Sequence, residues 1–350
     1  MRVALVAPFV AAIDDQAAQI GGAQAVIADL ARGLVARGHD VTVLAPRGSR
    51  VSGATVVDLG LPADPRAALR PDAAGAAGAM DHVFRAAAAW LDARAARFDV
   101  IHGHAFDVPA FAAIRGARVV HTLHLPPLDG AVVAAVRGSV ATLATVSESC
   151  RAGWRAAGVE ISEILPNGIE VAAVPAGEGS GGYLAFAGRM SPEKDPAAAC
   201  RVARRLGLPL RLAGPRYDEG YFRKQVEPEL GGDITYAGPL ERTALWRLLG
   251  GAAATLLPIR WEEPFGMVAL ESIACGTPVV AYRRGGLVDV VVDGRSGCLV
   301  PPDDEDALGV AVGTASRFAR SACRSDASRF DLARMLDAHE SLYRRVADTA

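Results

Sequence analysis

Lysine is almost absent from this chain of 350 residues, which has only Lys194 and Lys224 among its 37 lysine and arginine residues. Alanine occupies 69 positions, an imbalance that is typical of a GC-rich coding sequence. A lysine that is kept under such a bias is a candidate for a chemical role. The formal net charge is only −2, which argues against a chain-wide electrostatic attraction to nucleic acid or to anionic lipid.

Cysteine is also sparse. The five cysteines are odd in number and include no C-x-x-C pair, which argues against a disulfide framework and a structural zinc site and favours a reducing cytoplasm. No uncharged apolar run reaches the ~18 residues of a membrane span. The apolar stretch 3–13 could be the core of a signal peptide, but Asp14 and Asp15 after it also fit a buried first strand followed by a loop.

The rest of the composition is that of a globular protein, with 51% hydrophobic and 22% charged residues, and the length predicts about two domains. Short apolar runs alternate with helical stretches in both halves of the chain. This alternation predicts parallel sheets that are covered on both faces. The expected strands lie within residues 2–8, 40–46, 98–104, 118–125, 143–149, 183–188, 210–214, 234–238, 254–259, 278–282 and 298–301.

A stretch rich in glycine and other small residues, 172–182, predicts a linker. It would separate an N-terminal domain, 1–171, from a C-terminal domain, 183–330. The last segment, 331–350, is expected to be a helix that packs on a domain surface through one apolar face. That face comprises Leu332, Met335, Leu336, His339, Leu342, Tyr343 and Val346.

The segment 261–280 carries the densest pattern of candidate site residues. A proline followed by Phe265 and Gly266 predicts the start of a helix, with Glu263 at its mouth. Glu271 is eight residues further on, ~12 Å along a helix axis, which is about the span of a nucleotide diphosphate sugar. The alternative is a solvated glutamate at a helix cap and another on the helix surface, but the pattern of the whole segment argues against it.

Free backbone N–H groups at the start of this helix would face a diphosphate, since a helix N-terminus favours an anion. They belong to Gly266, Met267 and Val268.

A second segment, 186–196, leaves an expected strand through Gly188 and presents Arg189 and Lys194 on a loop. Ligands of parallel sheets collect at the carboxyl ends of strands, and two cations there suit a phosphate or diphosphate. The alternative is that both cations form surface ion pairs with Glu193 and Asp195.

The N-terminal half offers weaker signals. Gly21 and Gly22 precede the helix expected over 23–37 and permit close approach of a phosphate or sugar, although they lack the full G-x-G-x-x-G pattern. Histidines on alternate positions of a strand can share one metal, so a metallohydrolase is an alternative, although its usual spacing is broken here. Four histidines fall at apparent strand ends: His102, His104, His121 and His124.

Taken in order, several motifs resemble the retaining glycosyltransferases of family 4. These are Gly21-Gly22, L-P-N-G-I at 165–169, G-R-M-S-P-E-K at 188–194, E-P-F-G-x4-E from Glu263 to Glu271, and A-C-G-T-P at 274–278. The stretches 183–189 and 221–228 are most similar to a subgroup that includes an avilamycin-pathway glycosyltransferase.

The resemblance implies an α/β architecture of the GT-B type, in which two Rossmann-like domains face each other across a cleft and a final helix crosses back to the first. It further implies that Arg189 and Lys194 hold the donor diphosphate and that Glu271 binds the ribose hydroxyls. Glu263 and the backbone of residues 265–267 would hold the donor sugar.

The same resemblance implies that Gly22, from the other domain, lies over the donor. It also implies that the backbone of residues 236–240, up to Leu240, contacts the nucleotide base. His124 matches the family's histidine beside the donor sugar and acceptor, although His121 is open as an alternative.

The expected reaction moves a hexose-type sugar from a nucleotide diphosphate sugar, by family frequency a UDP-sugar, to a hydroxyl acceptor with retention of configuration. No D-x-D motif stands at a donor loop, so cations and a helix dipole would replace a metal, and no cofactor is expected.

The acceptor, bound by loops within 9–19 and 64–80, could be a glycan, a lipid or a small natural product. An epimerase or phosphorylase of the same fold and an inactive sugar-nucleotide sensor are rival interpretations. We expect no nucleic-acid partner and no firm membrane anchor.

Overall fold

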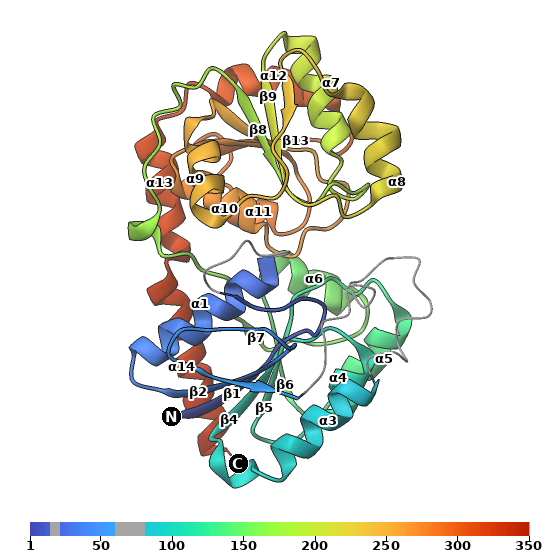
Figure 1. Cartoon of the computed structure of the whole chain (residues 1–350), viewed down its shortest axis with the longest axis vertical. Coiled ribbons are helices and arrows are strands. Elements are labelled where there is room, and N and C mark those ends of the chain that lie inside the picture. The colour runs from blue at the N-terminus through green and yellow to red at the C-terminus, as the bar shows by residue number, and fades with distance from the viewer. Residues whose placement is uncertain (15–21, 60–80, 350) are drawn as a thin grey trace. The chain divides into compact units, whose positions relative to one another are not determined.

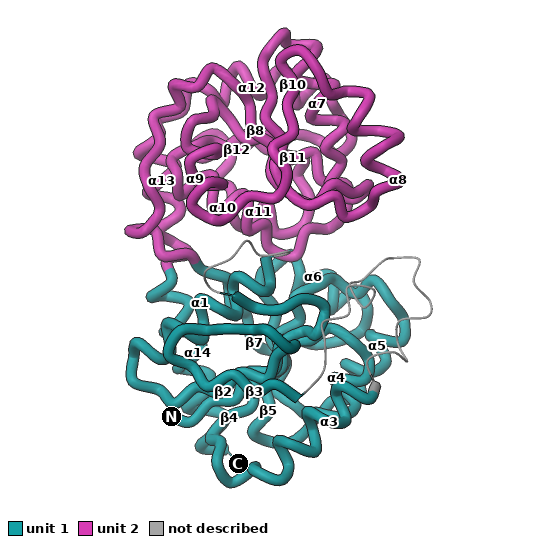
Figure 2. Tube along the Cα trace, in the orientation of Figure 1, with its two compact units in different colours: residues 1–168, 332–350 teal, residues 169–331 magenta. Residues whose placement is uncertain are grey.

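The computed structural model describes residues 1–14, 22–59 and 81–349. The chain forms two compact units, shown in Figures 1 and 2. Unit 1 contains Met1–Gly168 together with Leu332–Ala350, and unit 2 contains Ile169–Asp331. Each unit has its own parallel sheet, as the alternation of strands and helices predicts.

The described part of unit 1 contains a seven-stranded sheet in the order β3-β2-β1-β4-β5-β6-β7, and all its neighbouring strands are parallel. Strands β1, β2, β4 and β5 are mostly buried and mostly apolar, as strands covered on both faces are, whereas β3 and β7 are partly exposed. Their bounds are β1 Arg2–Val6, β2 Asp40–Ala45, β3 Thr55–Asp58, β4 Val100–Gly103, β5 Val119–Leu123, β6 Thr142–Thr145 and β7 Glu163–Ile164.

Helices cover both faces of this sheet (Figure 1). Ala4 and Val6 of β1 share a buried cluster with Phe84 of α3, so the alternating Val3 and Leu5, also buried, face the opposite side. On the described residues the helices are α1 Gly22–Ala36, α3 Asp81–Asp92, α4 Val108–Ala113, α5 Gly130–Arg137, α6 Glu148–Ala156 and α14 Leu332–Asp348.

The C-terminal helix α14 belongs to unit 1 and packs against α1. Its apolar face is buried at every position that the periodicity indicates. Leu336 fits closely over Gly33 of α1, where a Cβ atom would lie 2.7 Å from the leucine Cδ1. The missing side chain of Gly33 therefore allows the two helices to approach each other.

Unit 2 contains, in the described residues, a six-stranded parallel sheet in the order β10-β9-β8-β11-β12-β13. Its strands are β8 Leu184–Ala187, β9 Leu210–Ala213, β10 Ile234–Tyr236, β11 Ala254–Leu257, β12 Val279–Tyr282 and β13 Gly297–Val300. Its α-helices are α7 Pro196–Leu206, α8 Glu219–Tyr221, α9 Arg242–Gly251, α10 Met267–Ala274, α11 Leu287–Val290, α12 Glu305–Ala315 and α13 Arg320–Ala327.

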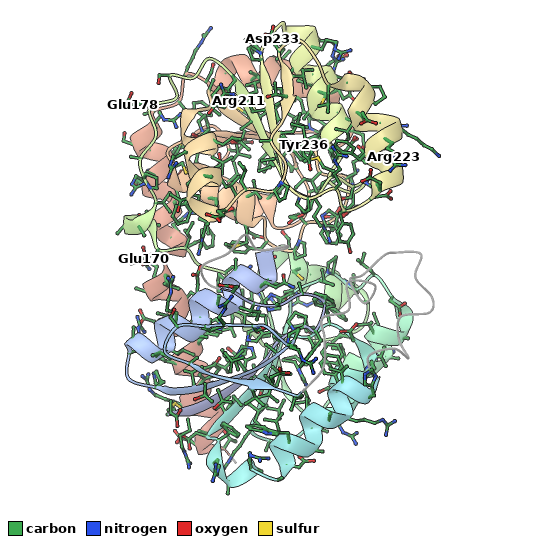
Figure 3. The ribbon with its side chains drawn as sticks, viewed as in Figure 1. Glu170, Glu178, Arg211, Arg223, Asp233 and Tyr236 are labelled. Carbon is green, nitrogen blue, oxygen red and sulfur yellow. The ribbon has the colours of Figure 1, made fainter. Side chains whose placement is uncertain are left out.

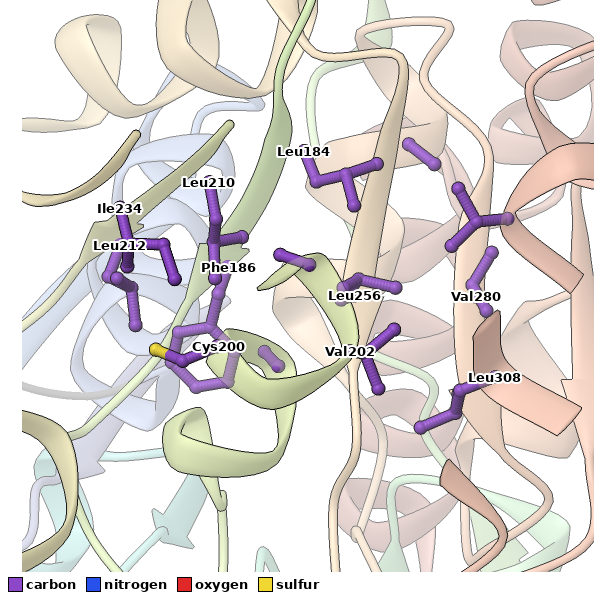
Figure 4. Close-up of a cluster of buried hydrophobic side chains, with 14 of the residues drawn as sticks. Leu184, Phe186, Cys200, Val202, Leu210, Leu212, Ile234, Leu256, Val280 and Leu308 are labelled. Carbon is purple, nitrogen blue, oxygen red and sulfur yellow. The ribbon is translucent and has the colours of Figure 1, made fainter. Parts of the chain in front are cut away.

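The core of unit 2 lies between this sheet and the helices α7 and α12 (Figure 4). Phe186 and Leu256 of the strands pack with Val202 of α7 and Leu308 of α12. Arg211 and Arg223, which are labelled in Figure 3, are exposed. Strands β8, β11 and β12 are buried throughout and apolar at nearly every position, which is typical of strands covered on both faces.

The segment 172–182 differs from the expected linker because it is part of unit 2. The backbone N–H of Gly177 donates to the carbonyl of Cys275, that of Gly179 to Gly250 and that of Gly181 to Gly251. These bonds hold the segment against the ends of α9 and α10. The change of unit falls after residue 168 and not after 171.

In the part of the chain that the structure describes, no helix has the length and apolar composition to cross a membrane. The five cysteines are free thiols.

Candidate functional site

The strand order of unit 2 reverses between β8 and β11, which are neighbours in the sheet. Ligands of open parallel sheets bind at such a reversal, beyond the carboxyl ends of the strands. The loop after β8 carries Arg189 and Lys194, and the loop after β11 leads to Glu263. The backbone N–H of Arg260 donates to the carbonyl of Glu193 at 2.9 Å, which ties the two loops together. The fold thus joins the two richest motifs of the sequence.

Lys194 and Glu263 form an ion pair at this reversal, and their side chains are only 14% and 11% exposed. The indole N–H of Trp261 donates to the same Glu263 oxygen at 2.6 Å, and the lysine Nζ lies 5.2 Å from the centroid of the Trp261 ring. The cation is therefore held by a carboxylate and an aromatic face together. Lys194 pairs with Glu263 and not with Asp195, which caps α7 through Ala198 N.

Arg189 lies beside this pair, where its guanidinium carbon is 4.5 Å from the ring centroid of Tyr217 and 6.0 Å from that of Trp261. It forms an ion pair with Glu193 at 3.0 Å. The alternative of a local ion pair thus holds for Arg189 but not for Lys194. Stacking on aromatic rings fixes the plane of the guanidinium and leaves its fork able to meet a phosphate.

Helix α10 begins at Met267, one residue after Gly266, whose φ of 97° lies in the left-handed region. A side chain at Gly266 would be strained there, and its Cβ would lie 2.8 Å from Leu287 Cδ2. No side chain of the described residues caps this helix end, where Met267 and Val268 are half-buried and Phe265 is buried. The first N–H groups of α10 can therefore bind an anion.

Because α10 starts at Met267, Glu271 lies in its second turn, whereas Glu263 precedes the helix in the loop. The spacing of ~12 Å derived for one continuous helix therefore does not apply to these two residues.

Glu271 has surroundings that repeat those of Glu263. The indole N–H of Trp246 donates to Glu271 Oε1 at 3.3 Å, and Arg242 Nε lies 3.9 Å from the same oxygen. The Arg242 guanidinium is also placed over the Trp246 ring, 5.0 Å from its centroid. Each site glutamate is thus oriented by a tryptophan N–H and by a cation that lies over that tryptophan.

Trp246, Trp261 and Arg242 were not predicted to be functional from the sequence. Only their positions in the sequence could have indicated a role. Trp261 lies two residues before Glu263, and Arg242 and Trp246 are four residues apart on a helix, the spacing at which side chains meet.

We expect Trp246→Phe to weaken binding of UDP about five- to tenfold, because it removes one hydrogen bond to a carboxylate, of about 1 kcal/mol, while keeping the ring. Isothermal titration calorimetry measures the change. Trp90→Phe, at a tryptophan of α3 in unit 1, is the matched control and should bind UDP as the wild type does. Equal affinity of Trp246→Phe and wild type would contradict the role of the indole N–H.

In unit 1, His124 directly follows β5, and its side chain retains some exposed surface. His121 lies within β5 with no exposed surface, and its Nε2 donates to the Ile114 carbonyl at 2.9 Å. A Cβ at Gly103 would collide with the His121 ring, so glycine on the neighbouring strand makes room for it. The structure thus places His124 at the carboxyl edge of the sheet and His121 in the core.

The other two histidines, His102 and His104, are also buried. His102 bonds to Tyr343 Oη at 2.6 Å and to Thr122 Oγ1 at 2.7 Å, and His104 bonds to His124. Burial lowers the pKa of His121 and of His124 to about 4, so these side chains are neutral at pH 7. Among the residues that the structure describes, no three His, Cys, Asp or Glu side chains are arranged to bind a metal ion.

The remaining predicted residues are more scattered. Gly21 lies outside the described residues, as do the acceptor-loop ranges 15–19 and 64–80, while Gly22 is the first residue of α1. Leu240 is half-buried in the loop after β10. Phe9, expected in an acceptor loop, is fully buried against Phe84 and belongs to the core.

Two family models match successive parts of this chain. The model described as "Glycosyltransferase Family 4" matches residues 20–173, and the model described as "Glycosyl transferases group 1" matches residues 176–315. A D-inositol 3-phosphate glycosyltransferase of Acidothermus cellulolyticus is 30% identical over an alignment that covers 89% of this chain and 82% of the relative.

Solved structures share the architecture over the whole chain. AviGT4, a glycosyltransferase involved in avilamycin A biosynthesis, is 25% identical with a TM-score of 0.73 and covers 100% of this chain and 99% of its own. HepE of Anabaena, solved with UDP-glucose, is 18% identical with a TM-score of 0.74 and covers 98% and 99%. The two Rossmann-like units and these neighbours confirm the GT-B fold class.

Proposed function

The chain belongs to the family 4 glycosyltransferases, and on this basis we propose that it transfers a hexose-type sugar from a UDP-sugar to a hydroxyl acceptor, with retention of configuration and without a metal ion. The observation that carries this proposal is the cluster at the strand-order reversal of unit 2. There Arg189, Lys194 and the uncapped start of α10 gather cationic and N–H groups beside the carboxylates Glu263 and Glu271.

The proposed roles follow from charge and position. Arg189, Lys194 and the first N–H groups of α10 stabilise the negative charge that develops on the leaving diphosphate. Glu271, oriented by Trp246, accepts hydrogen bonds from the ribose hydroxyls. Glu263, fixed by Lys194 and Trp261, accepts from hydroxyls of the donor sugar, as does the backbone of residues 265–267.

In the proposed reaction, the bond between the sugar C1 and the diphosphate oxygen breaks as the acceptor oxygen forms a bond to C1 from the same face. The acceptor proton passes to an oxygen of the leaving diphosphate. In this proposed reaction, configuration is retained without a covalent enzyme intermediate.

The choice of UDP is supported by the resemblance to family 4 and by HepE, whose structure contains UDP-glucose. The full-length match to AviGT4 supports the proposal that the chain belongs to the same subgroup and that its acceptor is a natural product. The proposed donor and the proposed acceptor can be tested independently, since one set of loops would bind the donor and other loops would bind the acceptor.

The test is thermal stabilisation of the wild type by UDP, GDP and ADP, each with excess EDTA. A ligand that binds only the folded state adds about 2.7 kcal/mol of stability at a hundred times its Kd, so UDP should raise Tm measurably without metal. Arg189→Ala should lose most of this shift.

Arg211→Ala is the matched control, because Arg211 is an exposed arginine of β9 that stacks on Tyr183 away from the site loops. It should keep the shift. A larger shift with GDP or ADP would correct the base, and a shift that needs a divalent cation would contradict metal independence. No shift with any of the three nucleotides would overturn the proposed function.

A further inference from the structure

His104 and His124 face each other through ring nitrogens, His104 Nδ1 being 2.9 Å from His124 Nε2. Both side chains are buried, at 1% and 8% exposure. His104 follows β4, which lies next to β1 where the strand order of unit 1 reverses. The backbone N–H of His104 donates to the Val6 carbonyl across that reversal. The pair therefore stands at the edge of the sheet where a ligand of unit 1 would bind.

The other nitrogen of His104 distinguishes two arrangements of protons. His104 Nε2 is buried and has no hydrogen-bond partner among the described residues. Both rings are neutral, since burial lowers the pKa of each imidazole, so each ring carries one N–H. If His124 donated to His104, the proton of His104 would sit on Nε2 as a buried donor without an acceptor.

The opposite arrangement avoids this defect. When His104 donates from Nδ1, its Nε2 is only an unpaired acceptor, and orphaned buried N–H groups are rarer than under-satisfied acceptors. His124 then accepts at Nε2 and must carry its own proton on Nδ1.

Resting on the proposed function, we propose that His104 is a positioning residue that fixes His124 as the Nδ1–H tautomer, so that His124 offers an N–H donor to an oxygen of the donor sugar or acceptor. With Nε2 bound to His104, Nδ1 is the ring nitrogen that is left for a substrate. A donor there suits a sugar hydroxyl oxygen, whereas the other tautomer would present a lone pair.

The interior of unit 1 holds this arrangement in place. The rings of His102 and His104 stack with centroids 4.0 Å apart and planes tilted by 34°. His102 is itself held at both nitrogens, by Tyr343 of α14 and Thr122 of β5. The orientation of His104 is therefore set by the packing and not by solvent.

The tautomers are measured first, by long-range nitrogen–proton correlation NMR of the ligand-free protein with ¹⁵N-labelled histidine. His121 and His339 are internal references, because a carbonyl can only accept: His121 must carry its proton on Nε2 and His339 on Nδ1. We expect His104 and His124 to show the Nδ1–H pattern of His339. An Nε2–H pattern at His104 overturns the proposal.

Two variants then separate positioning from structure. In His104→Asn the side-chain amide can donate where Nδ1 did, whereas His104→Ala has no donor. We expect His124 to keep the Nδ1–H pattern in the asparagine variant and to move toward Nε2–H in the alanine variant. His82→Asn, at an exposed histidine, is the control for the loss of one imidazole.

Turnover is measured as UDP release from UDP-glucose. We expect His104→Ala to lower kcat about ten- to a hundredfold, the scale of a misplaced contact, with KM for UDP-glucose within about twofold of wild type, and His104→Asn to retain most of kcat. Equal loss in both variants would mean that His104 acts only as packing. If the wild type releases no UDP, UDP-glucose is rejected as the donor. The NMR measurement of the tautomers still shows whether His104 positions His124.

Discussion

Replacing Lys194 with alanine is expected to lower kcat/KM for UDP-glucose about 30- to 1,000-fold. Preorganised groups that stabilise developing charge contribute about 2–4 kcal/mol to the transition state, and Lys194, whose side chain is only 14% exposed, is a cation at the reversal of strand order. Steady-state release of UDP measures the loss. Arg189→Ala is expected to fall in the same range.

The control for this prediction is the only other lysine of the chain, Lys224, which is exposed. Lys224→Ala should turn over UDP-glucose at the wild-type rate. Lys194→Ala also leaves Glu263 without its cation, so a loss of stability could imitate a loss of catalysis.

The double variant Lys194→Met with Glu263→Gln separates the two effects, because removing both charges of a buried pair is less damaging than removing one. We expect it to recover much of the thermal stability that Lys194→Ala loses without recovering turnover. If turnover stays within threefold of wild type in Lys194→Ala, Lys194 does not act on the leaving group.

Acidification is expected to unfold unit 1 between about pH 6 and pH 4 while unit 2 stays folded. All seven histidines of the chain belong to unit 1. Burial lowers the pKa of three of them to about 4 and holds the pKa of His102 and His104 well below the ordinary value of 6.5. The five buried histidines are His102, His104, His121, His124 and His339.

The direction follows from proton uptake. The folded state keeps these rings neutral, whereas the unfolded chain protonates them below about pH 6.5, so their contribution to stability is complete above pH 6.5 and is lost as the pH falls toward 4. Asp107 acts in the opposite direction, because burial raises its pKa to about 7 and unfolding releases its proton.

Unfolding of unit 1 therefore takes up about four protons in total. The free energy of unfolding then falls by roughly 5 kcal/mol for each pH unit of acidification near pH 5. This is comparable to the whole stability of a typical domain.

Hydrogen–deuterium exchange with mass spectrometry checks the prediction, with labelling times corrected for the intrinsic pH dependence of exchange. Peptides of unit 1 should lose protection at a higher pH than peptides of unit 2. His121→Gln should make the loss less steep with pH, whereas His82→Gln, at an exposed position, should not. Loss of protection in both units at one pH would contradict the role of the buried histidines.

Features that depend on neighbouring residues were correctly predicted from the sequence. The apolar runs became the parallel strands, and the loop that carries Arg189 and Lys194 and the segment of Glu263 both follow strand ends. These features could be predicted because strand and turn preferences depend on residues a few positions apart. The resemblance to family 4 rests on the same local motifs.

The histidine that reaches the sheet edge could not be chosen from the sequence. His121 and His124 are three residues apart, yet only the register of β5 against β4 places His121 over Gly103 in the core. The assignment of residues 172–182 to unit 2 likewise depends on carbonyls near Gly250 and Cys275, which are far away in the sequence.

By itself, then, the sequence determined the class of fold and the family and supplied Arg189, Lys194, Glu263 and Glu271 as candidate site residues, because each of these rests on short, continuous motifs. Only the tertiary structure decided the pairings: Lys194 with Glu263, Trp246 with Glu271, and His104 with His124. The physical reason is that each pair joins residues 20 or more positions apart. Their meeting depends on strand order and register, which the packing of the whole unit selects and no local pattern encodes.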